Sequence, residues 1–314
     1  MLAEPIVDVA GVPLRLTASD RSRAEAVAAL FRHAERTSAR PRYALRFTAD
    51  APDCPAAPPA TIIDEVEVWR PEPDHLWLRS AEGLAAHVSP DGIVVGGDAP
   101  SLARVFRFVG LIALTHLLAQ EGKQLLHAGA VIADGQAILI LGATGTGKST
   151  LVFSALQHGW LALSDDMVAV HRSDGLVHAV GLPRPISVPD DVFRSAMPEG
   201  RRVPEDPRRR TELPAAALAR GTHPVGAIVV TSHGSLDDAT LEPMRGHDTL
   251  RVVLGASSSL LDPAVFPEVF AVAGALARTP AWSLAHGLDP AARLDSAARQ
   301  LDEVRRHLSV GATR

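Results

Sequence analysis

The sequence predicts an α/β protein with an N-terminal α+β module, and three observations support this prediction. The first is a continuous apolar run at 137–141, typical of a parallel strand that is covered on both faces. The second is the glycine-rich turn that follows it, after which a helix is expected from Lys148 to a stop at Gly159. The third is a set of short alternating runs nearer the N-terminus, such as 43–47 and 66–69, which are typical of short strands.

Two domains are expected, an α+β module at 1–122 and a second domain at 123–314. In the first, helices are predicted at 21–32, where alanine and leucine recur on one side, and at 101–120. The second is expected to finish in an amphipathic helix whose cap and first turn are 289–290. The apolar stripe of that helix consists of Leu294, Leu301, Val304 and Leu308.

Composition excludes several classes of protein. Apolar residues make up 46% of the chain and charged residues 21%, as in globular proteins with a hydrophobic core. The net charge of −5 argues against a general nucleic-acid binder. Cys54 is the only cysteine, and the N-terminus lacks the pattern of a signal peptide, so a cytoplasmic protein is expected. The longest apolar stretch, 108–118, contains His116 and is too short to cross a bilayer, so it predicts a buried helix and no membrane partner.

The most specific feature is a segment that fits the phosphate-binding pattern G-x-x-x-x-G-K-[ST]. It consists of Gly142, Ala143, Thr144, Gly145, Thr146, Gly147, Lys148 and Ser149. Lys148 and Lys123 are the only lysines in the chain, and a compact ammonium can enter a ring of backbone amides where the wide fork of arginine cannot. Unpaired N–H groups at the start of the following helix, as far as Thr150, would point at the same phosphate. The alternative is a glycine-rich turn that binds no ligand.

The pattern therefore predicts a bound nucleoside triphosphate, with the hydroxyl of Ser149 on a magnesium ion that bridges the terminal phosphates. Two adjacent acids, Asp165 and Asp166, follow the next predicted strand at 160–164. We expect this second parallel strand to bring its carboxyl end beside the phosphate-binding loop through a right-handed crossover. One carboxylate would then hold magnesium, and the other would accept a proton from an attacking hydroxyl. The alternative is a solvated turn before the apolar run 167–170.

Two arginine-bearing segments follow. Arg184 lies between prolines that fix the backbone, so it is a candidate to hold a phosphate or an acceptor peptide; the alternative is a surface arginine on a stiff loop. The segment 201–210, which includes Arg208, is the only dense basic run. It is either a mobile loop that closes on the triphosphate or on an acidic peptide, or a solvated linker interrupted by acids and prolines.

The segment from Leu126 to Val170 resembles the catalytic core of the HPr kinase/phosphorylase family. The shared features are His127 before the first core strand, the strand, the phosphate-binding loop, the helix, a glycine turn and the paired acids. Residues 181–187 are similar to a proline-arginine segment of divergent relatives in this family. Some of these relatives accompany the biosynthesis of ribosomally made peptides, including lasso peptides, and phosphorylate a serine of the precursor. The resemblance extends weakly to the C-terminus and does not include the N-terminal module.

The resemblance implies the fold of the C-terminal domain of HPr kinase for 123–314. It implies that Lys148 and Ser149 handle phosphates and magnesium, that Asp165 is the base and that Asp166 is its metal-side partner. It places His127 near the reacting phosphoryl group, although a histidine at the start of an apolar strand is also a common structural residue. No cluster of His, Cys and acids has metal-ligand spacing, so magnesium is expected to arrive with the ATP.

The implied reaction transfers the γ-phosphoryl group of ATP to a hydroxyl, namely a serine of a peptide or small protein such as a ribosomal precursor peptide. The glycine-rich signature with an acid, which follows the paired acids in true HPr kinases, is not evident, which argues against HPr as the substrate and against phosphorolysis. Two alternatives stay open. A small-molecule kinase similar to shikimate or gluconate kinases has the same order of elements, although its loop usually lies near the N-terminus. The other alternative is a nucleotide-dependent regulator that catalyses no reaction. The sequence also leaves open whether the chain forms a homo-oligomer.

Overall fold

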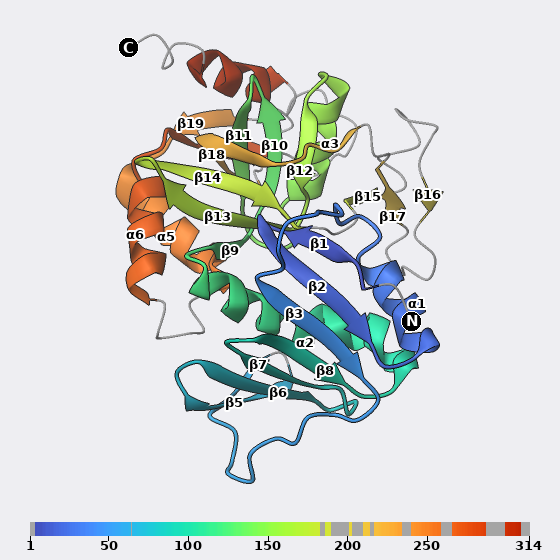
Figure 1. Cartoon of the computed structure of the whole chain (residues 1–314). Coiled ribbons are helices and arrows are strands. Elements are labelled where there is room, and N and C mark those ends of the chain that lie inside the picture. Colours follow the sequence, from blue (N-terminus) through green and yellow to red (C-terminus); the bar gives the residue numbers. More distant parts are fainter. Residues whose placement is uncertain are drawn as a thin grey trace. The chain divides into compact units, whose positions relative to one another are not determined.

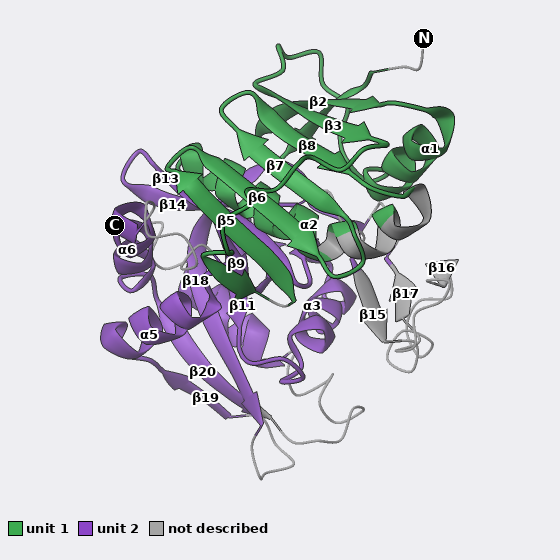
Figure 2. Ribbon diagram, turned by 90° about the horizontal axis from the view of Figure 1, so that it is seen from below, with its two compact units in different colours: residues 1–122 green, residues 123–314 purple. Residues whose placement is uncertain are grey.

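The computed structural model describes residues 4–63, 65–182, 186–189, 201–202, 210–213, 217–233, 240–258, 266–286 and 299–308 (Figure 1). The chain divides into two compact units, Met1–Gly122 and Lys123–Arg314, which we name unit 1 and unit 2 (Figure 2). Each is a mixed α/β arrangement of one large sheet with helices. Within the described ranges, no helix combines the length and the apolar character needed to cross a bilayer.

Unit 1 is built on an eight-stranded sheet with the order β1-β2-β3-β8-β7-β6-β5-β4. Its strands are β1 (Ile6–Val9), β2 (Val12–Ala18), β3 (Tyr43–Thr48), β4 (Thr61–Ile63), β5 (Val66–Glu72), β6 (His75–Ser80), β7 (Ala85–Ser89) and β8 (Gly92–Gly96). Helix α1 (Arg21–Leu30) links the parallel strands β2 and β3, and α2 (Ala99–Gln120) packs against α1, β6, β7 and β8. Both helices confirm the sequence prediction. The apolar stretch inside α2 is largely buried, but Phe108 is half-exposed.

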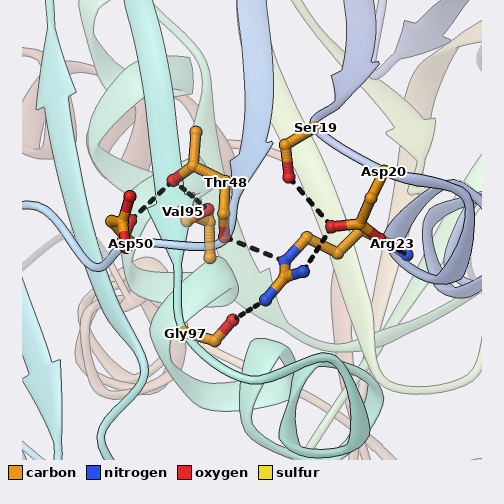
Figure 3. Close-up of polar contacts among 7 residues, drawn as sticks. All are labelled: Ser19, Asp20, Arg23, Thr48, Asp50, Val95 and Gly97. Atoms are coloured by element: carbon orange, nitrogen blue, oxygen red, sulfur yellow. Dashed lines mark hydrogen bonds and ion pairs between the residues drawn. The ribbon is translucent and has the colours of Figure 1, made fainter.

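The start of α1 is fixed by Arg23 (Figure 3). Asp20 caps the helix by accepting a hydrogen bond from the Arg23 N–H at 3.0 Å, and this bond lowers the pKa of Asp20. The Arg23 guanidinium also contacts the Asp20 carboxylate, and it donates to the carbonyls of Thr48 at 2.9 Å and Gly97 at 2.5 Å. One side chain therefore joins α1 to the ends of β3 and β8.

The sheet of unit 2 is centred on β11. Its strands are β9 (Gln124–His127), β10 (Gly129–Ala133), β11 (Gln136–Leu141), β12 (Leu161–Ser164), β13 (Met167–Ser173), β14 (Leu176–Gly181), β18 (Thr222–His233), β19 (Thr240–Pro243) and β20 (Ala281–His286). Strand β11 pairs antiparallel with β10 and parallel with β18, and β18 continues parallel to β20. The first residues of β18 pair with β14, which attaches the antiparallel strands β14, β13 and β9 to the main sheet.

Helices cover both faces of β11. Ile138 and Ile140 belong to a core cluster with α3 (Lys148–Gln157) and the helix at 299–308. Leu139 and Leu141 belong to a second cluster with α5 (Gly246–Ala256) and α6 (Phe266–Leu276). The alternate residues of β11 thus enter opposite cores, which explains the continuous apolar run and confirms the predicted strand. A small sheet of β15 (Ser187–Pro189), β17 (Arg210–Glu212) and β16 (Arg201–Arg202) adjoins α3.

One detail departs from the sequence prediction. The strand after α3 is β12, and it runs in the same direction as β11, but β10 lies between them and bonds to both. The expected parallel neighbour of β11 is instead β18, from much later in the chain. The predicted C-terminal helix is present at 299–308, with Leu301, Val304 and Leu308 buried; its expected cap at 289–290 and Leu294 lie outside the described residues.

Leu301→Ala tests how strongly this last helix is held. Leu301 is almost fully buried in the core shared with α3, so truncation should lower the free energy of unfolding by about 2–5 kcal/mol. Glu303→Ala, on the exposed side of the same helix, should stay within about 0.5 kcal/mol of wild type. Urea unfolding measures both; equal stability of the two variants would contradict the packing.

Candidate functional site

The glycine loop, residues 142–149, connects the carboxyl end of β11 to α3. Gly142 has φ 144°, and a Cβ there would lie 2.5 Å from Thr231 Oγ1 and 2.6 Å from the Thr231 carbonyl oxygen, so only glycine fits. Gly147, with φ 95°, is the N-cap of α3, and its cap carries no side-chain hydrogen bond among the described residues. The first-turn N–H groups and the positive end of the helix dipole are features that attract an anion.

Lys148 lies inside this loop. Its Nζ donates to the carbonyl of Gly142 at 2.8 Å and to that of Ala143 at 3.1 Å, and the residue is only 7% exposed. Burial lowers the pKa of Lys148, and the Asp166 carboxylate acts in the opposite direction. A buried ammonium that donates to neutral carbonyls is a group that an added anion would stabilise.

Asp165 and Asp166 form the turn between β12 and β13. Since β11 and β12 both pair antiparallel with β10, their carboxyl ends lie at the same edge of the sheet. Ala130 of β10 is opposite Leu139 of β11 on one side and Ser164 of β12 on the other. The acidic turn is therefore at the same sheet edge as the glycine loop, and the Asp166 carboxylate opposes the lowering of the Lys148 pKa by burial.

His127 joins the same edge from β9. It is the last residue of that strand and pairs with Met167, the residue that follows the two acids. Its Nδ1 lies 3.2 Å from Oδ1 of Asp166, and the two side chains are 38% and 47% exposed. Three separate segments thus contribute His127, Lys148 and Asp166 to one sheet edge, with Asp165 in the same turn as Asp166.

Sequence reasoning missed Ser164, which shapes the acidic turn. Its buried Oγ donates to the Met167 carbonyl at 2.6 Å and accepts from the N–H groups of Met167 at 3.1 Å and Asp166 at 3.3 Å. A serine at the end of an apolar strand, directly before two acids, is a recognisable local signal for such a turn. Thr231, which bonds to the glycine loop from β18, was also missed and gave no local signal.

The remaining predicted residues are distributed as follows. Ala143, Thr144, Gly145 and Thr146 belong to the loop, while Ser149 and Thr150 occupy the first turn of α3. Ser149 is partly exposed, and the side chain of Thr150 is buried. Arg184 and Arg208 lie outside the described residues.

The arrangement fits a magnesium-bound triphosphate. N–H groups at the start of α3, a buried ammonium and a glycine backbone suit phosphate oxygens, and a nearby carboxylate suits magnesium. In the part of the chain that the structure describes, no three His, Cys, Asp or Glu side chains are grouped to hold a metal ion by themselves. Magnesium here would therefore share its ligands with the phosphates.

Comparisons with known proteins add little to this geometry. No protein-family model matches the chain, and no curated protein matches it. Among solved structures, it is similar to the Hpr(Ser) kinase/phosphatase from Coxiella burnetii at 13% identity, over 59% of this chain and 99% of that one. The TM-score is 0.32, so this likeness carries no conclusion about the chain.

Ser164→Ala tests the construction of the acidic turn. Removal of the hydroxyl leaves the buried Met167 N–H without an acceptor, so the free energy of unfolding should fall by about 1–3 kcal/mol. Ser173→Ala is the matched control, because Ser173 Oγ donates to the exposed Asp174 carboxylate. This variant should change the free energy of unfolding by less than about 0.5 kcal/mol. Thermal and urea unfolding compare them, and an unaffected Ser164→Ala variant would show that the turn does not need this bond.

Proposed function

We propose that the chain is an ATP-dependent kinase that transfers the γ-phosphoryl group of magnesium-bound ATP to a hydroxyl. The observation that carries this proposal is the position of the Asp165–Asp166 turn at the same sheet edge as the glycine loop, with Asp166 close enough to affect the Lys148 pKa. A loop alone would support nucleotide binding; acids beside it supply the groups that phosphoryl transfer needs.

The glycine loop and α3 would bind the phosphates. In the structure, the Lys148 ammonium is held by two carbonyls, and phosphate oxygens would be stronger partners for it than these neutral dipoles. The N–H groups at the start of α3 add further hydrogen-bond donors for the phosphate oxygens. Once Lys148 has moved from the carbonyls to the phosphates, it and these donors would neutralise charge on the transferring group.

Asp166 and Ser149 are the proposed magnesium ligands. His127 lies at hydrogen-bonding distance from one carboxylate oxygen of Asp166 and would orient that carboxylate. Magnesium bound there supplies charge stabilisation to the terminal phosphates. This role would make His127 a positioning residue for Asp166 as well as a neighbour of the reacting group.

Asp165 is the proposed base. It would accept the proton of the acceptor hydroxyl while the oxygen of that hydroxyl bonds to the γ-phosphorus and the bond to the leaving ADP breaks. The proposed acceptor is a serine of a peptide or small protein in the cytoplasm, supported by the resemblance of Leu126–Val170 to the HPr kinase core. Arg184 and Arg208 are proposed to contact the phosphates or this acceptor.

Lys148→Ala should abolish transfer, because it removes a buried charge that contacts the reacting phosphates; we expect a loss of at least about 100-fold. The assay follows label from γ-labelled ATP into serine-containing peptides, including a precursor peptide encoded beside the gene, and into hydroxylated metabolites. Lys123→Ala, at the only other lysine, is the control and should keep wild-type transfer. Full activity of Lys148→Ala would refute the assignment. If label appears only in metabolites, the acceptor is a small molecule and not a peptide.

Asp165→Asn should separate binding from chemistry. The amide cannot accept the proton, so transfer should fall by about 100-fold to 10,000-fold, while calorimetric affinity for magnesium-ATP stays near that of wild type. Asp174→Asn, in the exposed β13–β14 turn at φ 52°, changes the same charge away from the site and should preserve both quantities. Loss of ATP binding with Asp165→Asn would move the base elsewhere. Tight ATP binding by wild type without any labelled acceptor would favour a nucleotide-dependent regulator.

A further inference from the structure

Two threonine hydroxyls connect the glycine loop to a strand that the proposed chemistry does not use. Thr231 lies on β18, one residue beyond the Val230–Leu141 pair, and is 2% exposed. Its Oγ1 donates to the carbonyl of Leu141 at 3.0 Å and lies 2.9 Å from Oγ1 of Thr146. One hydroxyl therefore contacts the loop at its entry and again near its end.

The two hydroxyls of this pair can donate only one hydrogen bond each. Each hydroxyl has one hydrogen, and Thr231 uses its hydrogen on the Leu141 carbonyl. The Thr146 hydroxyl can then donate either to Thr231 Oγ1 at 2.9 Å or to the Ala143 carbonyl at 2.8 Å. Both acceptors are within reach without any movement of the backbone.

The hydrogen bonds of Thr146 matter for Lys148, because both side chains donate to the Ala143 carbonyl. Its ammonium donates to the carbonyls of Gly142 and Ala143, and it must leave them to reach a phosphate. When it leaves, the Ala143 carbonyl can still accept from Thr146, whose N–H and hydroxyl lie 3.3 and 2.8 Å away. The Ala143 carbonyl thus keeps hydrogen-bond donors when the ammonium moves to a phosphate.

The close contact at Gly142 supports the same conclusion. A Cβ on Gly142 would be 2.5 Å from Thr231 Oγ1 and 2.7 Å from Thr146 Oγ1, so the loop backbone packs directly on the hydroxyl pair. The loop therefore takes its shape from β18 as well as from its own sequence.

We propose that Thr231 is a positioning residue for nucleotide binding, holding residues 142–146 in the shape that directs the loop amides and Lys148 at the phosphates. This inference rests on the proposed function. Thr231 itself touches no phosphate; it acts through Thr146 and the Leu141 carbonyl.

The test is calorimetric titration of the full-length chain with magnesium-ATP and with ADP. Thr231→Val keeps the shape of the side chain and removes the hydroxyl, so affinity for both nucleotides should fall about tenfold, the equivalent of one or two lost hydrogen bonds. Thr231→Ser restores the hydroxyl and should recover most of the affinity. Thr249→Val is the matched control, because Thr249 is equally buried and bonds to the Arg245 carbonyl in α5, away from the loop.

The outcomes separate the two proposals. Thr249→Val should lose thermal stability but keep its nucleotide affinity, so stability loss alone would not account for a weak Thr231→Val variant. The inference is overturned if Thr231→Val binds ATP as tightly as wild type, or if Thr231→Ser is as weak as Thr231→Val. If wild type binds neither nucleotide, the proposed function fails and this inference fails with it.

Discussion

The candidate site depends on the double pairing of β10. This strand bonds antiparallel to β11 on one edge and to β12 on the other, which forces β11 and β12 into one direction and brings the glycine loop and the two acids to one edge. Gly129 contributes at the same place. A side chain there would press on Val152 of α3 at 3.0 Å, so glycine allows the helix that follows the glycine loop to lie close to the sheet.

Electrostatics and packing act together at this edge. Lys148 is buried beside backbone carbonyls, and burial lowers its pKa while Asp166 opposes that change. The energetic cost of a desolvated cation is therefore only partly offset within the chain. A triphosphate would supply the missing negative charge, whereas magnesium would offset the acids. In the proposed function, the two halves of a metal–nucleotide complex would therefore offset the opposite charges of the site together.

Local patterns in the sequence predicted the elements that depend on neighbours along the chain. The apolar run of β11, the glycine loop and the start of α3 are confirmed at Gln136–Leu141 and Lys148–Gln157. Strand order was not predictable in this way, because the pairing of β11 with β10 and β18 depends on residues far along the chain. Thr231 is 85 residues from Thr146, so no spacing rule could have joined them. Ser164, in contrast, precedes the acids directly and its turn-forming role could have been inferred.

Neutral hydroxyls contribute to both turns that frame the site, beside the Lys148 ammonium and the His127–Asp166 contact. Ser164 closes the acidic turn, while Thr146 and Thr231 fix the glycine loop. A charged side chain in either place would interact with Lys148 or Asp166 over the same short distances and would compete with phosphate and magnesium. A hydroxyl satisfies two backbone groups without adding net charge, and it can donate or accept as its neighbours change. In the proposed function, Lys148, Asp165 and Asp166 would act on the ligand, while the neutral hydroxyls would contribute to the geometry of the two turns.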